Sequence, residues 1–201
     1  MRRHVIALAT LLAACTPALA FDDAVQSFAD HFKVGKPVPA SALVVLMMEA
    51  ETWCYNQRDN ECGWSEVYLS DDGENVRYEL SNPWDEAVDI AYVSQIARRD
   101  DGQLCEIGFD WLPSLRAYAR EDGLSLEGRD LEDMRQRVFN VVDPADSSDC
   151  YSYVYGGADS DAETMTLTQR QYIGGEYQPG MDAEVTLHFD QDSARHLGWY
   201  L

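Results

Sequence analysis

Basic residues are scarce in this sequence of 201 residues. Lysine and arginine together number 15, against 36 aspartate and glutamate residues, and the only lysines are Lys33 and Lys36. The formal net charge is −21 at pH 7. Binding to nucleic acid needs a positive surface that neutralises phosphates, so the composition argues against that class of partner. A basic protein or a cationic ligand is the partner that this charge favours.

Long apolar runs are absent beyond the first 20 residues. A membrane-spanning helix needs about 20 apolar residues, so we expect no transmembrane segment in the mature chain. Residues 1–20 have the layout of a secretory signal peptide. Arg2 and Arg3 precede a short uncharged apolar run, and Ala18 and Ala20 stand at positions −3 and −1 of a cleavage site. Cleavage there removes two arginines and no acid, which changes the formal charge from −21 to −23.

A second processing route is open in the same segment. The sequence Leu-Ala-Ala-Cys that ends at Cys15 resembles a bacterial lipobox, in which Cys15 would be lipidated and become the new N-terminus. Pro17 and a helix expected to begin near Phe21 favour cleavage after Ala20, because lipidation would leave only a short tether. Both routes predict an exported protein, either periplasmic or secreted, with an outer-membrane lipoprotein as the alternative.

The cysteines predict a disulfide framework. Both routes take Cys15 out of the thiol pool and leave four cysteines. An even number of cysteines in an exported chain indicates disulfides, here two. Four cysteines allow three connectivities, of which we predict Cys54 with Cys62 and Cys105 with Cys150. No C-x-x-C pair is present, so the sequence gives no support for a redox motif or a zinc site.

Signatures of catalysis are also absent. The sequence has no serine-nucleophile elbow, no phosphate-binding loop and no zinc-binding helix motif. His188 alternates with apolar residues in a predicted strand, and we expect it on the wet face of a sheet; a general base is the less favoured interpretation. We therefore expect no catalytic residue, no cofactor and no resident metal. The prediction is a non-catalytic binding or structural module. One alternative is a secreted glycan-acting hydrolase, in which an Asp/Glu pair would act as acid and base.

Two groups of residues are weak candidates for ligand binding. Tyr151, Tyr153 and Tyr155 alternate along one strand and so share a face. Aromatic rings beside carboxylates suit sugars, although we favour core packing for them. A second group places oxygen ligands at alternate positions, as calcium loops do, but it lacks the glycine and the bidentate glutamate of an EF-hand. A solvated loop is favoured there, and a calcium-stabilised domain is the alternative; the residues are Asp159, Asp161 and Glu163.

The periodicity of apolar residues predicts an α+β domain over residues 21–201. Short connections between successive strands favour an antiparallel β-sheet, with N-terminal helices and a helical insert packed against it. Helices are expected over residues 21–32, 41–50, 113–121 and 131–141. Strands are expected over residues 65–69, 75–80, 87–97, 103–109, 150–155, 163–172 and 183–189.

Overall fold

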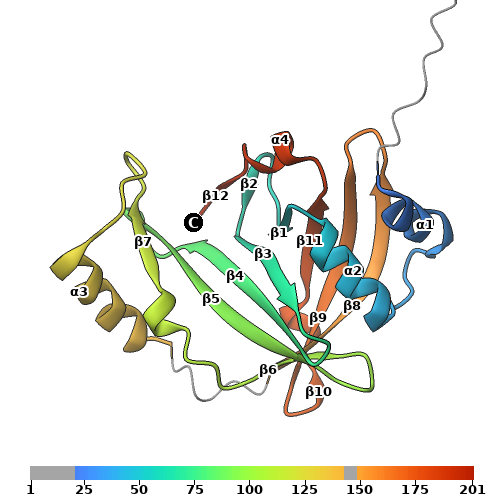
Figure 1. Cartoon of the computed structure of the whole chain (residues 1–201), viewed down its shortest axis with the longest axis horizontal. Coiled ribbons are helices and arrows are strands. Elements are labelled where there is room, and N and C mark those ends of the chain that lie inside the picture. Colours follow the sequence, from blue (N-terminus) through green and yellow to red (C-terminus); the bar gives the residue numbers. More distant parts are fainter. Residues whose placement is uncertain (1–20, 143–148) are drawn as a thin grey trace, which may run out of the picture.

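The computed structural model describes residues 21–142 and 149–201, and within them the fold is mostly antiparallel β with a few helices, as predicted (Figure 1). The helices are α1 (Asp23–His31), α2 (Ala40–Glu49), α3 (Gly128–Phe139) and α4 (Gln191–Ala194), with short 3-10 turns η1 (Leu112–Ser114) and η2 (Pro179–Met181). The strands of the first half are β1 (Thr52–Tyr55), β2 (Glu61–Cys62), β3 (Trp64–Asp71), β4 (Asn75–Pro83), β5 (Val88–Arg98) and β6 (Leu104–Glu106). Those of the second half are β7 (Arg116–Ala119), β8 (Asp149–Asp159), β9 (Thr164–Ile173), β10 (Glu176–Tyr177), β11 (Ala183–His188) and β12 (Gly198–Trp199).

The main sheet closes on itself, which the sequence did not predict. Its strands follow the order β9-β11-β1-β3-β4-β5-β6-β8, and β8 pairs back onto β9, so eight strands form a barrel. Closure depends on pairings between segments far apart in the chain, such as Thr52 of β1 opposite His188 of β11. A closed sheet leaves few unpaired strand edges, which protects it from pairing with other chains.

Side chains alternate between the inside and the outside of this barrel. On β1, Trp53 and Tyr55 point inward and are fully buried. At the end of the barrel where α2 lies, the interior is apolar, and Leu46 and Met47 of α2 pack into the same cluster. This end is therefore a conventional hydrophobic core that is covered by the N-terminal helices.

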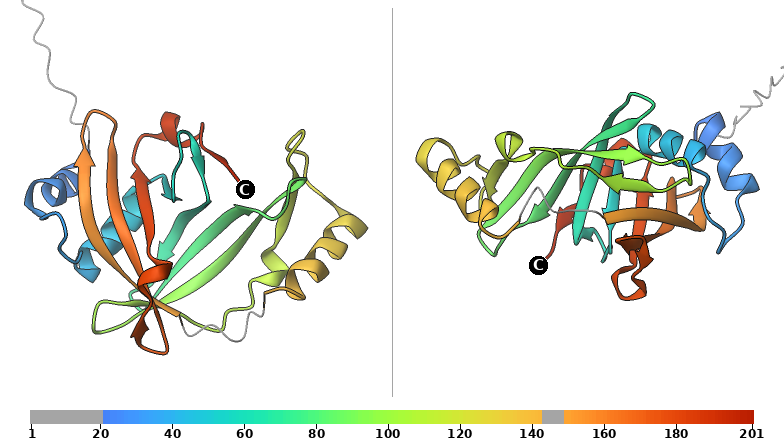
Figure 2. Two further views of the ribbon diagram at one scale, coloured as in Figure 1. Left: turned by 180° about the vertical axis from the view of Figure 1, so that it is seen from behind. Right: turned by 90° about the horizontal axis from the view of Figure 1, so that it is seen from below.

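The β4–β5 hairpin continues beyond the barrel and carries a second, smaller core (Figures 1 and 2). Val88 and Ile90 of β5 pack there against Trp111 and against Met134 and Val138 of α3. Strand β7 pairs with β5 along this extension. We call β7, α3 and the turns that join them the insert, because they lie in the chain between β6 and β8.

One side chain links the two halves of β5. On one edge β5 pairs with β7 through Val88–Ala91 and with β6 through Ile96–Arg98, which leaves Val93 between the two pairings. The Val93 N–H donates instead to Oγ of Ser114 at 2.9 Å, and that hydroxyl donates to the Trp111 carbonyl at 2.6 Å. Ser114 thus satisfies a backbone group that neither neighbouring strand can reach.

We expect Ser114→Ala to lower the free energy of unfolding by about 1–2 kcal/mol, because it leaves the Val93 N–H without its acceptor. Urea unfolding followed by far-UV circular dichroism measures the loss. Ser160→Ala, in an exposed turn, is the matched control and should change stability by less than about 0.5 kcal/mol. Equal stabilities of the two variants would contradict this role for Ser114.

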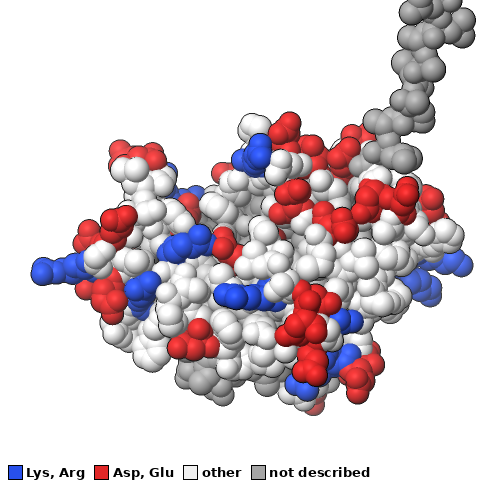
Figure 3. All heavy atoms as spheres, viewed as in Figure 1, with Lys and Arg blue, Asp and Glu red and all other residues white. Residues whose placement is uncertain are grey.

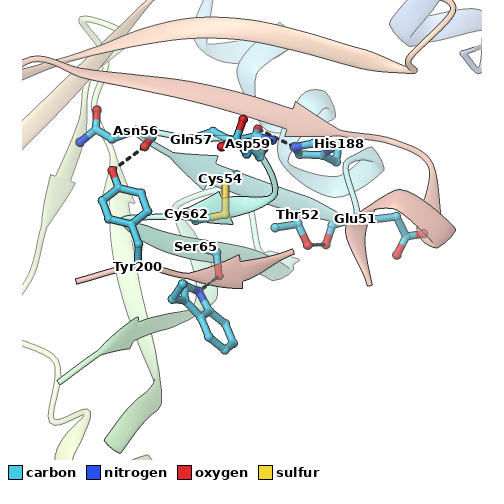
Figure 4. The surroundings of a disulfide bond; sticks show 11 residues. Glu51, Thr52, Cys54, Asn56, Gln57, Asp59, Cys62, Ser65, His188 and Tyr200 are labelled. Atoms are coloured by element: carbon cyan, nitrogen blue, oxygen red, sulfur yellow. Dashed lines mark hydrogen bonds between the residues drawn. A yellow bond between two sulfur atoms is a disulfide. The ribbon is translucent and has the colours of Figure 1, made fainter. Parts of the chain in front are cut away.

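Both predicted disulfides are present, in agreement with an exported protein. Cys54 and Cys62 join β1 to β2, with Cα atoms 5.3 Å apart, and Cys105 and Cys150 join β6 to β8, with Cα atoms 3.9 Å apart. The first disulfide fixes the short strand β2, against which β12 pairs in parallel (Figure 4).

The helix predicted over residues 113–121 is wrong. The structure has the turn η1 followed by β7, in which Ala117 is buried and Arg116 is exposed. The free edge of β5 offers backbone partners to this segment, and that tertiary pairing outweighs local helix propensity. The strand predicted over residues 103–109 is shorter and ends at Glu106. The other predicted helices and strands are present with shifted ends. Over the described residues, no helix is long and apolar enough to cross a membrane.

Candidate functional site

The end of the barrel opposite α2 holds a cavity of about 210 Å³. Its walls come from seven elements, and most of the lining side chains are the inward-facing ones of strands. They are Trp64, Glu66, Tyr68, Tyr78, Leu80, Tyr92, Ile96, Glu106, Tyr151, Tyr153, Gln169, Gln171 and Met181. The lining side chains become more exposed from Tyr153 and Gln169 outward to Met181 of η2, so the cavity approaches the surface beside that turn.

Glu66 is the central polar group of this cavity. It lies on β3 and is only 8% exposed. Its Oε2 atom accepts hydrogen bonds from the hydroxyls of Tyr55, at 2.7 Å, and Tyr68, at 2.6 Å. No donor among the described residues reaches its Oε1 atom. A carboxylate with one oxygen fully engaged and the other without a donor has unused capacity to accept hydrogen bonds.

Burial raises the pKa of Glu66 from its ordinary 4.5 to about 7; hydrogen bonds from Tyr68 and Tyr55 act in the opposite direction, and the charge of Glu106 raises it further. Burial and the charge of Glu66 also raise the pKa values of Tyr55 and Tyr68. These phenols therefore stay protonated and serve as donors. The carboxyl group of Glu66 changes its charge near neutral pH.

A second carboxylate and a polar network complete the lining. Glu106 of β6 accepts a hydrogen bond from the Tyr151 hydroxyl at 3.0 Å. Gln169 of β9 donates to the Tyr153 hydroxyl at 2.8 Å, and that hydroxyl lies 3.5 Å from the one of Tyr55. The buried polar groups of β1, β3, β8 and β9 are thus connected, which fixes their orientation.

Tyr151, Tyr153 and Tyr155, which the sequence places on one strand face, have different surroundings in the structure. All three point into the barrel, as their alternation predicts. Tyr151 and Tyr153 line the cavity, whereas Tyr155 belongs to the apolar core, where its ring centroid lies 5.5 Å from that of Phe32. Core packing therefore accounts for Tyr155, and Tyr151 and Tyr153 remain candidates for ligand binding.

No family model, curated protein or solved structure matches this chain. The chemistry of the cavity is therefore the basis for assigning a function.

His188 was expected on the solvent-exposed face of a sheet, and this prediction is wrong. It points out of the barrel but is only 6% exposed, because the segment that follows β1 covers it. Its Nε2 atom lies 2.9 Å from Oε1 of Gln57, and burial lowers its pKa (Figure 4). It lies on the opposite face of the sheet from the cavity, so the structure does not bring His188 and Glu66 together.

The calcium candidates form the turn between β8 and β9. Oδ1 of Asp159 accepts hydrogen bonds from the backbone N–H groups of Asp161 and Ala162, and Glu163 has a positive φ of 50°. In the part of the chain that the structure describes, no group of three or more His, Cys, Asp or Glu side chains is placed to hold a metal. Cys15, the candidate for lipidation, lies outside the described residues.

Two larger hollows lie on the outer surface. One, of about 370 Å³, is bounded by β4, β5, β7 and Trp199, and its charged groups are already paired: Arg120 lies 3.3 Å from Asp89, and Arg116 pairs with Glu79. The other, of about 660 Å³, is a shallow region beside α2. Asp89 in the first hollow also has a buried oxygen without a hydrogen bond, but Arg120 supplies its countercharge. Among the described residues, no lysine, arginine or histidine lines the barrel cavity around Glu66, which distinguishes it from that hollow.

Glu66 and Glu106 were not predicted from the sequence as site residues. A signal for Glu66 was present, because it alternates with Trp64 and Tyr68 and so shares their face. The opposite face of the same strand carries Val67 and Leu69, so the sequence alone does not decide which face is buried. In the structure Val67 and Leu69 are 38% and 48% exposed, and the face with the aromatic rings and the acid points inward.

Proposed function

We propose that this protein is an exported, non-catalytic binding protein that holds a small polar ligand inside its barrel. The observation that carries the proposal is Glu66, a buried carboxylate with a free oxygen in an aromatic-lined cavity. Burial of an ionisable group without a full set of partners costs free energy, and such groups gather at functional sites. Concave aromatic cavities with a few fixed polar groups are the usual form of small-molecule sites.

The size of the cavity limits the ligand. A volume of 210 Å³ corresponds to roughly seven water molecules at their volume in the liquid. Sites for drug-sized ligands have about 300–1,000 Å³, so the ligand here is smaller than these. Residues that line the cavity include neither a serine nor a cysteine that could act as a nucleophile. Size and lining both favour binding over covalent catalysis.

Binding is tested with the mature protein, nuclear magnetic resonance and a panel of small amines, sugars, amino acids and phosphate. We expect at least one compound to shift the indole N–H signal of Trp64 and the side-chain amide signal of Gln169. Leu80→Trp fills the cavity and should abolish these shifts. Val67→Trp, on the outer face of β3, is the matched control and should leave them unchanged. A panel without any shift at millimolar concentration would overturn the proposal.

Glycan hydrolysis is the second candidate, because the raised pKa of Glu66 suits a general acid and Glu106 is a second carboxylate in the same cavity. The cavity is small for sugars on both sides of a scissile bond, which is why we place this function second. Incubation with 4-nitrophenyl glycosides separates the two. Turnover that is lost in both Glu66→Gln and Glu106→Gln would favour the hydrolase and contradict the non-catalytic proposal.

A further inference from the structure

This inference rests on the proposed function and names the ligand class: we propose that the cavity binds a small organic cation, held by the carboxylates of Glu66 and Glu106 and by the faces of the surrounding aromatic rings. The charge of the lining is the first argument. The residues that line the cavity, all in the described part of the chain, include two glutamates and no lysine, arginine or histidine. An anionic ligand would meet only like charge there, and a cation would meet two opposite charges.

The free oxygen of Glu66 is the second argument. Tyr55 and Tyr68 both donate to Oε2, so the protein orients the carboxylate and leaves Oε1 for another group. Opposite charge stabilises the ionised form of a buried carboxylate, and none of the described residues that line the cavity supplies such a charge. An ammonium ligand would provide the missing countercharge.

Aromatic rings around the carboxylates are the third argument. Trp64 stacks on Tyr55 with ring centroids 4.6 Å apart, and Tyr78 and Tyr92 line the same cavity from β4 and β5. Ring faces attract cations, most strongly where water is excluded, and Trp is the best of them. Walls of this kind around two carboxylates suit an alkylated ammonium group better than a hydrated metal ion, which needs several oxygen ligands.

The overall charge of the protein acts in the same direction. Acidic side chains gather in patches over the face shown in Figure 3, with basic ones scattered among them. A net charge of −21 raises the local concentration of small cations and speeds their encounter with the protein at low salt.

The test compares choline with 3,3-dimethyl-1-butanol, which has nearly the same shape but no charge. Isothermal titration of the mature protein should give a dissociation constant for choline at least ten-fold lower than that for the neutral compound. Glu66→Gln should weaken choline binding at least ten-fold and leave binding of the neutral compound unchanged. Glu184→Gln removes the same charge from the exposed outer face of β11 and is the matched control, with less than a two-fold effect expected.

The outcomes separate this inference from the proposed function. Equal affinity for choline and its neutral isostere would overturn the cation proposal but leave a ligand-binding barrel. If choline does not bind but a sugar or phosphate from the panel does, the cation proposal is likewise overturned and the ligand-binding proposal is kept. No binding of any compound would overturn both. If Glu66→Gln fails to fold, Glu106→Gln serves in its place, and the same ten-fold loss is expected.

Cation binding should also depend on pH. The ionised form of Glu66 binds the cation, so affinity should fall as pH is lowered from 8 to 6, and Glu66→Gln should show a flatter profile. Among the described residues, the titratable groups that face Glu66 are Tyr55 of β1, Tyr68 of β3, Tyr78 of β4, Tyr92 of β5, Glu106 of β6 and Tyr153 of β8. Burial raises the pKa values of these tyrosines, so they do not titrate in this range. Identical profiles for the two proteins would contradict a role for the Glu66 charge.

Discussion

Removal of the Cys105–Cys150 disulfide should lower the free energy of unfolding by about 4 kcal/mol, a large loss against the roughly 5–15 kcal/mol that native proteins commonly have. The barrel closes at β6 and β8 through only two residue pairs, Leu104 with Tyr151 and Cys105 with Cys150. The bond also closes a loop over a sequence separation of 45 residues, which restricts the unfolded chain. Urea unfolding of Cys105→Ala/Cys150→Ala under non-reducing conditions measures the loss.

The other disulfide provides the matched control. Cys54→Ala/Cys62→Ala removes the same number of sulfur atoms from buried positions, but the loop spans a separation of only 8 residues. The same chain-entropy argument gives a loss of about 2.6 kcal/mol. The variant without Cys105 and Cys150 should therefore be the less stable of the two. The reverse order would show that loop closure and the seam between β6 and β8 do not determine the effect.

Glu66 should make the protein less stable as the solution becomes more basic. Its pKa is about 7 in the folded protein and 4.5 ordinarily, so the folded state holds a proton that the unfolded state releases. The corresponding stability is fully present below pH 4.5 and is lost as pH rises through 7. The difference between the two pKa values corresponds to about 3 kcal/mol between pH 4.5 and pH 8. Glu66→Gln should lack this decline.

Unfolding free energies of the wild type and of Glu66→Gln, measured from pH 4.5 to pH 8, test this prediction. The difference between the two curves isolates Glu66, because all other titrating groups are common to both proteins. Glu184→Gln should give a curve parallel to that of the wild type, since this side chain is exposed. A parallel curve for Glu66→Gln would mean that burial does not hold a proton on Glu66.

Local features of the sequence predicted much of the fold. Asp101-Gly102 predicts the turn after β5, and the alternation of Tyr151, Tyr153 and Tyr155 predicts their common face. The presence of two disulfides followed from the even number of cysteines in an exported chain. Closure of the barrel could not be predicted in this way, because it depends on long-range pairs such as Thr52 with His188, for which short segments contain no signal.

The site was less predictable than the fold for a physical reason. An inward-facing strand surface normally carries the more apolar residues. Val67 and Leu69 make the face opposite Glu66 apolar, so the sequence of this strand does not show that Glu66 lies inside. The barrel reverses this order at one end, where Tyr55 and Tyr68 supply the hydrogen bonds that Glu66 needs. These partners come from two strands, and β1 was not predicted as a strand. Hydrogen bonds between strands that had not been paired could not be foreseen.

Strand β5 belongs to both cores of the protein. Val88 and Ile90 are buried under the insert, and two residues later on the same face Tyr92 lines the cavity, with its ring centroid 4.7 Å from that of Trp111. Loss of the insert would uncover Val88 and Ile90 and take the support from one side of Tyr92. Evolution could therefore not have added or discarded this segment freely while keeping the cavity intact. Related chains that keep Glu66 and Tyr92 should also keep a segment that covers this face of β5.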